Sequence, residues 1–237
     1  MNPQAYRHIF FDLDGTVTRS RSLITPEMTE ALHALLASGR DVIIVSGAAV
    51  TQSLSQTDNL PLLYLGQNGN HAYDGARKTD IWREFLTETE KNAIFDHIAS
   101  IPRTWEVTDE RDLIEDRGSQ ISYSLLGHHE DVSKKEKFDP KGDMRKRILS
   151  KHPLDSDTIQ VVIGGTTCFD YIRRGRHKGY NVSRLIEENR WNKDACVYVG
   201  DALFKGGNDE TVIGVIDTKQ VASPVETLAF VNEILGR

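Results

Sequence analysis

The chain has 237 residues, of which 38% are hydrophobic, and a formal net charge of −6 at pH 7. A chain of this length can form one large domain or two modest ones around a real apolar core. The negative charge excludes a general electrostatic attraction to nucleic acid or to an anionic membrane surface. We therefore expect a globular protein that binds neither.

Residues 8–18 carry the strongest functional signal in the chain. An apolar run ends in Asp12 and Asp14, and Gly15 follows. Because side chains alternate along a strand, we expect both carboxylates to leave the strand tip on the same side, with Leu13 directed to the core. Two like charges this close repel unless a cation or a shared proton relieves them. The pair predicts a metal, an acid/base division of labour, or both; the alternative, a plain Asp-Gly turn, needs only one acid.

The next elements predict a parallel α/β core. Apolar residues at helical spacing predict a helix over 25–39. Continuous apolar runs predict buried strands at 41–46 and 62–65, with a second helix between them. Strand, helix, strand, helix, strand is the pattern of a doubly wound sheet.

From Ile81 the rhythm changes to that of an inserted α+β module. Its expected elements are a helix at 87–100, strands at 105–107, 113–114 and 120–126, a charged helix at 134–151, and strands at 158–163 and 167–172. Acids interleave with the basic residues of 134–151, which favours a solvated helix face over nucleic-acid binding.

The parallel pattern returns at Lys178. Its expected elements are a helix from Lys178, an apolar strand at 195–199, a strand at 212–216 and a helix from Ser223. We expect residues 1–80 and 175–237 to form the core and residues 81–174 the inserted module.

Four residues outside the acidic pair could contact a phosphoryl group. Ser46 and Gly47 follow an apolar strand, so the hydroxyl and the nearby amides could hold a phosphoryl oxygen. A simple helix N-cap is an equal alternative for Ser46, and Thr16 is open to the same two interpretations. Lys178 and the two basic residues before it oppose a helix dipole, which calls for a bound anion unless the turn is merely solvated.

A third apolar strand ends in Asp201, and Gly206-Gly207-Asn208-Asp209 follows. Asp201 could complete a Mg²⁺ site with Asp12 and Asp14, because this ion prefers hard oxygen ligands. Asn208 and Asp209 would ligate the metal directly, or hold its waters and orient the nearby lysine. A plain turn is the alternative for the Gly-Gly-Asn-Asp segment.

These segments occur in the order of the four motifs of the haloacid dehalogenase (HAD) superfamily of phosphoryl-transfer enzymes, which the chain resembles over nearly its whole length. The resemblance implies an α/β fold, with a doubly wound parallel-sheet HAD core and an inserted α+β cap domain of type IIB. It also implies that Asp12 attacks phosphorus to form an aspartyl-phosphate, that Asp14 is the general acid/base, and that Mg²⁺ is the cofactor.

Within that subgroup the chain resembles eukaryotic-type phosphomannomutases. Gln67-Asn68-Gly69, Cys168-Phe169-Asp170 and Gly206-Gly207-Asn208-Asp209 are similar to segments of that family. Four cap residues are candidates for substrate contact, with a solvated polar face as the alternative for the arginines: Arg117, Asp170, Arg173 and Arg174.

Two departures from the mutase pattern favour hydrolysis. His128 stands where the family's cap has its last arginine, and Gln52 stands where the family has a lysine. We therefore expect a phosphohydrolase of a small phosphorylated metabolite, such as a sugar phosphate. A phosphomannomutase is the alternative, and a catalytically silent sugar-phosphate-binding protein is a third hypothesis.

The remaining features bear on the protein's setting. Cys168 and Cys196 show no metal-ligand or redox spacing, which favours reduced thiols and a cytoplasmic location. We expect neither a targeting leader nor a membrane-spanning run. Relatives that dimerise do so through the cap, so the resemblance allows a homodimer.

Overall fold

The computed structural model describes residues 2–237, which form two compact units. The core unit comprises residues 2–83, 178–205 and 209–237, and the cap unit comprises residues 84–177 and 206–208. Among the described residues, none of the helices combines the length and the apolar character that crossing a bilayer requires.

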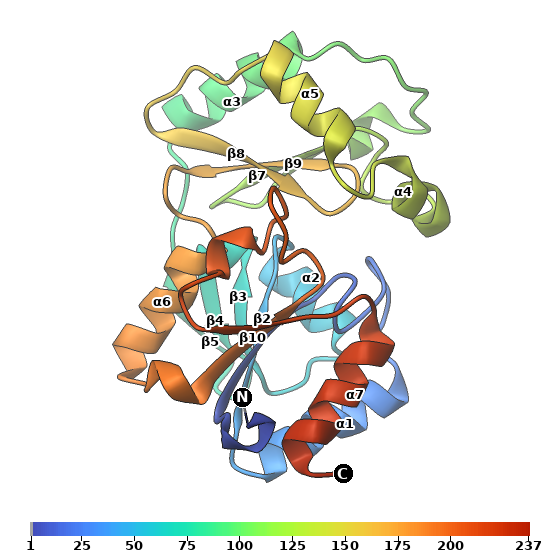
Figure 1. Ribbon diagram of the computed structural model, residues 1–237. Coiled ribbons are helices and arrows are strands. Elements are labelled where there is room, and N and C mark those ends of the chain that lie inside the picture. The colour runs from blue at the N-terminus through green and yellow to red at the C-terminus, as the bar shows by residue number, and fades with distance from the viewer. Residues whose placement is uncertain (1) are drawn as a thin grey trace. The chain divides into compact units, whose positions relative to one another are not determined.

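The core unit contains a seven-stranded sheet in the order β11-β10-β1-β2-β3-β4-β5 (Figure 1). Five strands run parallel: β1 (His8–Asp12), β2 (Asp41–Val45), β3 (Leu63–Gly66), β10 (Cys196–Gly200) and β11 (Asp217–Gln220). Two antiparallel strands, β4 (His71–Asp74) and β5 (Thr79–Arg83), extend one edge.

Helices cover both faces of this sheet, so the predicted doubly wound α/β core is confirmed. Apolar residues of α1 (Pro26–Ala37), α2 (Val50–Gln56) and α7 (Pro224–Leu235) pack on one face. Apolar residues of α6 (Lys178–Asn189) pack on the other. The predicted helix start at Pro26 is also correct, because the Thr25 hydroxyl accepts a hydrogen bond from the Met28 amide.

Alternation along β1 decides which helix its last residue meets. Ile9 and Phe11 pack with α1 and α7, whereas Phe10 packs with α6. Asp12 follows by period two and therefore faces the α6 side of the sheet.

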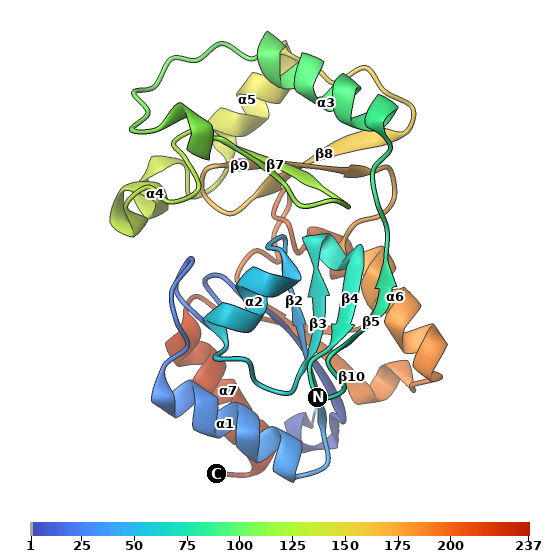
Figure 2. The same cartoon turned by 180° about the vertical axis from the view of Figure 1, so that it is seen from behind.

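The cap unit is an antiparallel sheet with helices on one face, which confirms the predicted α+β class (Figure 2). Its strands, in the order β6-β7-β9-β8, are β6 (Ile114–Asp116), β7 (Ile121–Ser124), β9 (Cys168–Arg173) and β8 (Ile159–Gly164). Its helices are α3 (Glu88–Ser100), α4 (Val132–Phe138) and α5 (Asp143–Lys151). Apolar residues of α3 and α5 cover one face of the sheet. Phe169 and Tyr171 of β9 lie on this covered face. The alternate positions, Cys168 and Asp170, therefore lie on the other face.

Short 3₁₀ turns complete the described chain: Pro3–Ala5, Gln67–Gly69, Glu110–Asp112, Lys193–Ala195 and Glu210–Val212.

Four details of the sequence prediction are wrong. The helix expected over 134–151 is two helices, because Pro140 lacks an amide proton and Gly142 has a φ of 69°. Residues 105–107 form no strand, although Trp105 and Val107 pack against the cap core. The last strand lies at 217–220 instead of 212–216, and β4 and β5 were not predicted.

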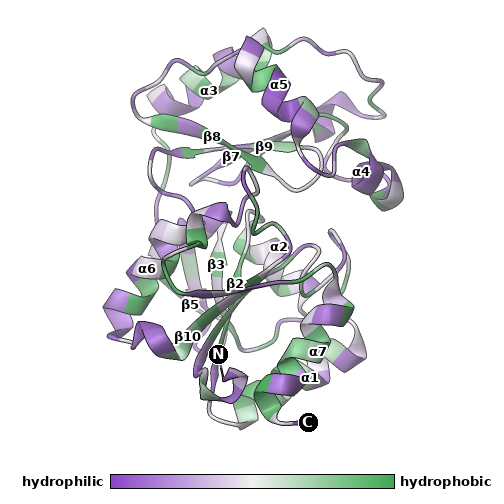
Figure 3. Ribbon diagram, in the orientation of Figure 1, coloured by the Kyte–Doolittle hydropathy of each residue, from purple (hydrophilic) through white to green (hydrophobic). Residues whose placement is uncertain are grey.

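The basic stretch 134–151 is only partly a solvated face. Figure 3 shows α4 and most of α5 in hydrophilic colours, yet Arg145 is fully buried and Lys135 nearly so. The Arg145 guanidinium donates to Asp139 Oδ2 at 3.0 Å and to the carbonyls of Gly164 and Cys168 at 2.6 and 3.0 Å. Arg145 thus donates, from inside the cap unit, to the backbone carbonyls that flank the turn between β8 and β9.

Replacing Arg145 with Met should strongly destabilise the cap, because Asp139 and several carbonyls would be left buried without their donor. We expect a loss of about 3–5 kcal/mol in the free energy of unfolding, measured by urea denaturation. Arg147→Met, on the exposed side of the same helix, is the matched control and should change it by less than about 0.5 kcal/mol. Equal effects of the two substitutions would contradict this assignment.

Candidate active site

A buried lysine joins two carboxylates at the carboxyl end of the core sheet. Lys178, the first residue of α6, is fully buried and its Nζ lies 2.5 Å from Asp12 Oδ1 and 2.8 Å from Asp209 Oδ1. The Tyr198 hydroxyl, on β10, donates to the same Asp209 oxygen at 2.6 Å. Burial alone would lower the pKa of Lys178, but the charges of Asp12 and Asp209 outweigh it and raise that pKa. The lysine is therefore charged and held against Asp12.

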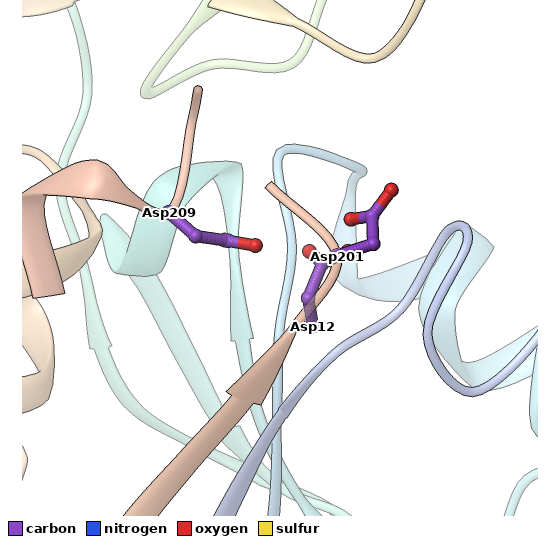
Figure 4. A group of neighbouring side chains, drawn as sticks. All are labelled: Asp12, Asp201 and Asp209. Carbon is purple, nitrogen blue, oxygen red and sulfur yellow. The ribbon is translucent and has the colours of Figure 1, made fainter. Parts of the chain in front are cut away.

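A third carboxylate, Asp201, completes an acidic group with Asp12 and Asp209 (Figure 4). One oxygen of each lies within 4.8 Å of the others. Gly15 makes room for this arrangement: its φ is +88°, and a β-carbon there would lie 2.6 Å from Asp201 Oδ2. The Asp-Gly turn after β1 thus admits the carboxylate at the end of β10.

The charge of this group is incompletely balanced by protein residues. Burial raises the pKa of Asp12 well above its usual range, with Lys178 opposing the shift and Asp209 and Asp201 adding to it. Burial and then the charge of Asp209 raise the pKa of Asp201 to about 6. Three carboxylates face one lysine, and all the potential ligands are oxygens. The group therefore fits a hard divalent cation.

Asp209 differs from the other two acids in its hydrogen bonding. Its Oδ1 accepts from Lys178 and Tyr198, and its Oδ2 accepts from the Ala202 amide at 3.2 Å. Such a carboxylate is well suited to orient Lys178 and less suited to ligate a metal directly. The neighbouring Asn208 is half-buried, and no described residue hydrogen-bonds its side chain.

Asp14 has hydrogen-bond partners different from those of Asp12, although its charge reaches the acidic group and helps to raise the pKa of Asp201. Its Oδ1 accepts from the Arg21 amide at 2.8 Å and from Gln56 Nε2 of α2 at 3.0 Å. The strand ends at Asp12, and the chain then turns, because the Leu13 carbonyl accepts from the Val17 amide. Period-two alternation no longer holds past that turn. The two acids thus face helices on opposite sides of the sheet.

Two hydroxyls near the strand ends have hydrogen-bonding capacity to spare. Thr16 Oγ1 is buried and has no hydrogen-bond partner among the described residues. Ser46 Oγ accepts from the Ala48 amide at 3.0 Å, which leaves its own proton to donate. Ser46 is not the N-cap of α2, since that position is Ala49. Gly47 is half-buried beside it.

The polar face of the cap sheet holds a second cluster. Both Arg117 Nε and Arg117 Nη2 donate to Glu115 Oε2, at 2.9 and 2.6 Å. Asp170 Oδ1 accepts from the Ser122 hydroxyl at 2.6 Å. Burial would lower the pKa of Arg117, but the charges of Asp170 and Glu115 outweigh it. The cationic head of Arg117 is therefore already paired within the cap.

His128 and Cys168 lie in the same cluster. His128 is buried, with Nε2 3.2 Å from the Ser122 carbonyl and Nδ1 4.0 Å from Cys168 Sγ. Nε2 must donate to that carbonyl, and Nδ1 faces both the thiol and Glu115 Oε1, which lies 3.7 Å away. Burial alone would raise the pKa of the Cys168 thiol, but its hydrogen bond with His128 lowers it to about 6.

The other two cap arginines make contacts that support the fold. Arg173 Nε donates to Glu90 Oε1 at 2.8 Å, and Arg173 Nη2 to the Phe85 carbonyl at 2.7 Å. Arg174 donates to the backbone carbonyls of Ser156 and Asp157 before β8. Neither guanidinium donates to Asp170.

Two residues of the site were not foreseen. Tyr198 shares the face of β10 that packs on α6, a placement that alternation back from Gly200 could have indicated. Gln56 ends a seven-residue helix, and nothing local in its sequence points to Asp14. The contact of Gln56 with Asp14 spans 42 positions of the chain, and that of Tyr198 with Asp209 spans 11.

The geometry is compatible with phosphoryl transfer: it has a buried carboxylate held by a lysine, an acidic group that fits a cation, and a nearby acid with its own hydrogen-bond partners. A family model described as haloacid dehalogenase-like hydrolase matches residues 9–210. The chain therefore belongs to the haloacid dehalogenase-like hydrolase family.

Individual proteins agree with this assignment. The chain is 27% identical over 240 residues to phosphomannomutase 1 of Dictyostelium discoideum and 28% over 245 residues to the phosphomannomutase of Spinacia oleracea, with 94% of each chain covered. The crystal structure of SMU.1108c from Streptococcus mutans has the same fold, with a TM-score of 0.72 at 14% identity over 98% of this chain and all of that one.

Asp201→Asn should have opposite effects on stability without and with a divalent cation, for which Mg²⁺ is the probe. Without metal, folding raises the pKa of Asp201 from 3.8 to about 6, so the wild type loses stability as pH rises through that interval. The variant lacks this loss and should be more stable at pH 7.5 by about 1–3 kcal/mol, with little difference near pH 4. With Mg²⁺ at 100 times its Kd, the wild type should gain about 2.7 kcal/mol and the variant much less.

Thermal unfolding at both pH values, with and without Mg²⁺, measures these differences. Asp155→Asn, an exposed aspartate of the cap unit, is the control and should leave the Mg²⁺ stabilisation unchanged. Equal Mg²⁺ stabilisation of wild type and Asp201→Asn would show that this group does not bind the cation.

Proposed function

We propose that the protein is a Mg²⁺-dependent phosphohydrolase of a small phosphorylated metabolite, a sugar phosphate, acting through an aspartyl-phosphate. The observation that carries this proposal is the pairing of buried Asp12 with Lys178, next to the acidic group formed with Asp201 and Asp209. Lys178 orients the Asp12 carboxylate, and Asp12 also belongs to the acidic group that would hold the cation. A phosphoryl group bound by that cation would therefore lie next to Asp12.

The two acids of the first turn divide the chemistry. Asp12 attacks phosphorus as the bond to the leaving oxygen breaks, and Asp14 gives its proton to that oxygen. Asp14 then takes a proton from the water that attacks the aspartyl-phosphate, which releases phosphate and restores Asp12. The separation of their side chains supports this division, because one acid is held by Lys178 and the other by Gln56.

Hydrogen-bond donors at the strand ends would stabilise the negative charge of the transferring phosphoryl group. Lys178 and the hydroxyls of Thr16 and Ser46 are proposed to contact phosphoryl oxygens, with the Gly47 amide beside them. Mg²⁺ would be held by Asp12, Asp201 and the backbone carbonyl of Asp14, and would offset negative charge on the phosphoryl group. Asn208 would contact its waters, and Asp209 would keep Lys178 in place.

The cap unit, comprising residues 84–177 and 206–208, is proposed to select the substrate. Arg117 and Asp170 are the polar residues we assign to contact with the sugar, because both belong to the cluster on the polar sheet face. Arg173 and Arg174 are assigned to the fold of the cap, since their guanidinium groups contact Glu90 and backbone carbonyls.

The pairing of Arg117 favours hydrolysis over a mutase reaction. A mutase must hold a bisphosphate by its far phosphate while the near one reacts. Glu115 already accepts from two donors of Arg117 and offsets its charge, which would weaken the hold of Arg117 on a far phosphate. His128 replaces the family's last cap arginine and faces the Ser122 carbonyl and the Cys168 thiol.

A phosphomannomutase is the second candidate, favoured by one observation. The two phosphomannomutases compared above align over 94% of this chain and of their own, including the cap. The distinction is which acceptor takes the phosphoryl group from Asp12: water in a hydrolase, or a hydroxyl of the sugar in a mutase.

The setting is proposed from the cysteines and the family. Cys168 and Cys196 are free thiols, which supports a reducing, cytoplasmic location. A homodimer through the cap is also part of the proposal, on the ground of the resemblance alone.

Incubation with mannose 1-phosphate, Mg²⁺ and a bisphosphate activator separates the two candidates. We expect release of inorganic phosphate without accumulation of mannose 6-phosphate. Asp12→Asn should lower that release on the order of 10³-fold or more, because the nucleophile is lost. Asp155→Asn is the control and should retain activity.

Rapid formation of mannose 6-phosphate without phosphate release would contradict the hydrolase and establish the mutase. Undiminished phosphate release by Asp12→Asn would show that the nucleophile is another residue.

A further inference from the structure

Gln56 connects the second acid of the first turn to helix α2. Its side chain is buried, and its Nε2 lies 3.0 Å from Asp14 Oδ1, 3.1 Å from Thr18 Oγ1 and 3.4 Å from the Ser22 carbonyl oxygen. Its Oε1 accepts from Gln52 Nε2 at 2.8 Å. One amide therefore spans the whole turn that carries Asp14.

The orientation of this amide follows from its neighbours. A carboxylate oxygen and a carbonyl oxygen both accept, so only the NH₂ end of Gln56 can face Asp14 and Ser22. The hydroxyl of Thr18 lies 3.5 Å from the Leu13 carbonyl, which accepts its proton and leaves Thr18 Oγ1 to accept from Gln56.

Hydrogen bonding makes the two oxygens of Asp14 unequal. Oδ1 accepts from Gln56 and from the Arg21 amide, whereas no described residue donates to Oδ2. An oxygen that accepts two N–H bonds is a poor site for a proton, so a proton on Asp14 belongs on Oδ2. We propose that Gln56 is a positioning residue that fixes the rotamer of Asp14 and assigns proton transfer to its Oδ2.

The surroundings of Gln56 support a positioning role. Arg21, whose amide is the other donor to Asp14, has a φ of 49°, an uncommon conformation for a residue with a β-carbon. The turn holds this conformation while both donors converge on one oxygen. Gln52, a departure from the mutase pattern, acts through Gln56 by fixing its carbonyl end.

The inference rests on the proposed function, in which Asp14 is the acid/base. In the first step, Asp12 bonds to phosphorus and the bond between phosphorus and the leaving oxygen breaks. As it breaks, the proton on Asp14 Oδ2 moves to that leaving oxygen. In the second, the attacking water gives its proton to the same Oδ2 as its oxygen bonds to phosphorus, and the bond between phosphorus and Asp12 breaks to release phosphate and restore the Asp12 carboxylate. Without Gln56, the Asp14 carboxylate loses one of the two hydrogen bonds that fix its Oδ1, and with it the fixed position of Oδ2.

Gln56→Met tests this because it keeps the length of the side chain and removes its N–H donors. The readout is the ratio of first-turnover rates, by rapid chemical quench with Mg²⁺, for mannose 6-phosphate and p-nitrophenyl phosphate. The alkoxide of the sugar needs a proton to leave, whereas p-nitrophenolate leaves without one. We expect Gln56→Met to lower the ratio by about 10- to 100-fold.

A double-mutant cycle separates positioning from a general loss of structure. In an Asp14→Asn background, Gln56→Met should leave the ratio unchanged, because there is no longer a proton to position. Ser53→Ala is the matched control: Ser53 is a buried residue of the same helix whose hydroxyl has no partner among the described residues. It should leave the ratio at the wild-type value.

A wild-type ratio in Gln56→Met, or a further fall of the ratio in the Asp14→Asn background, would overturn the proposal. If Gln56→Met does not fold, Gln52→Met decides: a smaller fall of the ratio supports the proposal and an unchanged ratio overturns it. Failure of wild type to turn over either substrate, or an Asp14→Asn variant with the wild-type ratio, would instead contradict the proposed function.

Discussion

The buried contact of Lys178 with Asp12 and Asp209 is the interaction on which the rest of the core unit depends. Lys178 and Asp12 are 166 positions apart in the chain, and the whole of 84–177 lies between them. Removing a lysine and two carboxylates from water costs several kcal/mol per ion, and only close pairing with further hydrogen bonds offsets that cost. Tyr198 and the Ala202 amide supply those further bonds to Asp209. The pairing thereby fixes the start of α6 against the ends of β1 and β10, which brings the acids of the site together.

The sheet assigns different surroundings to two acids that are neighbours in sequence. Asp12 ends β1 on the face covered by α6, where burial and other carboxylates surround it. Asp14 lies beyond the strand, in a turn held by Gln56 of α2, which packs on the other face. A nucleophile needs a fixed position and a balanced charge, whereas an acid/base needs one oxygen left open to the reacting atoms. The turn after β1 gives each acid the surroundings suited to its proposed role.

The sequence predicts the parts of this protein that depend on local patterns. Apolar runs and helical spacing locate α1, β2, α6 and β10 within one or two residues, and strand ends draw attention to Asp12 and Asp201. Contacts that depend on the packing of one segment against another are harder to predict from the sequence. Orienting Lys178 was one role expected of Asp209, and the hydrogen bond between them agrees with it, whereas the contact of Asp209 with Tyr198 was not foreseen. Arg145 was expected in solvent because charged residues flank it, yet it fills the inside of the β8–β9 turn. Such cases depend on what packs opposite a residue, which its neighbours in sequence do not specify.

The central claim is that Asp12 carries the phosphoryl group between substrate and acceptor. Acid quenching of the enzyme within the first turnover of mannose 6-phosphate or p-nitrophenyl phosphate, followed by mass spectrometry of its peptides, tests this directly. The account predicts the mass increment of one phosphoryl group on the peptide that contains Asp12, at that residue, and its absence in Asp12→Asn. A phosphoryl group on another residue, or turnover without any phosphorylated peptide, would contradict the account.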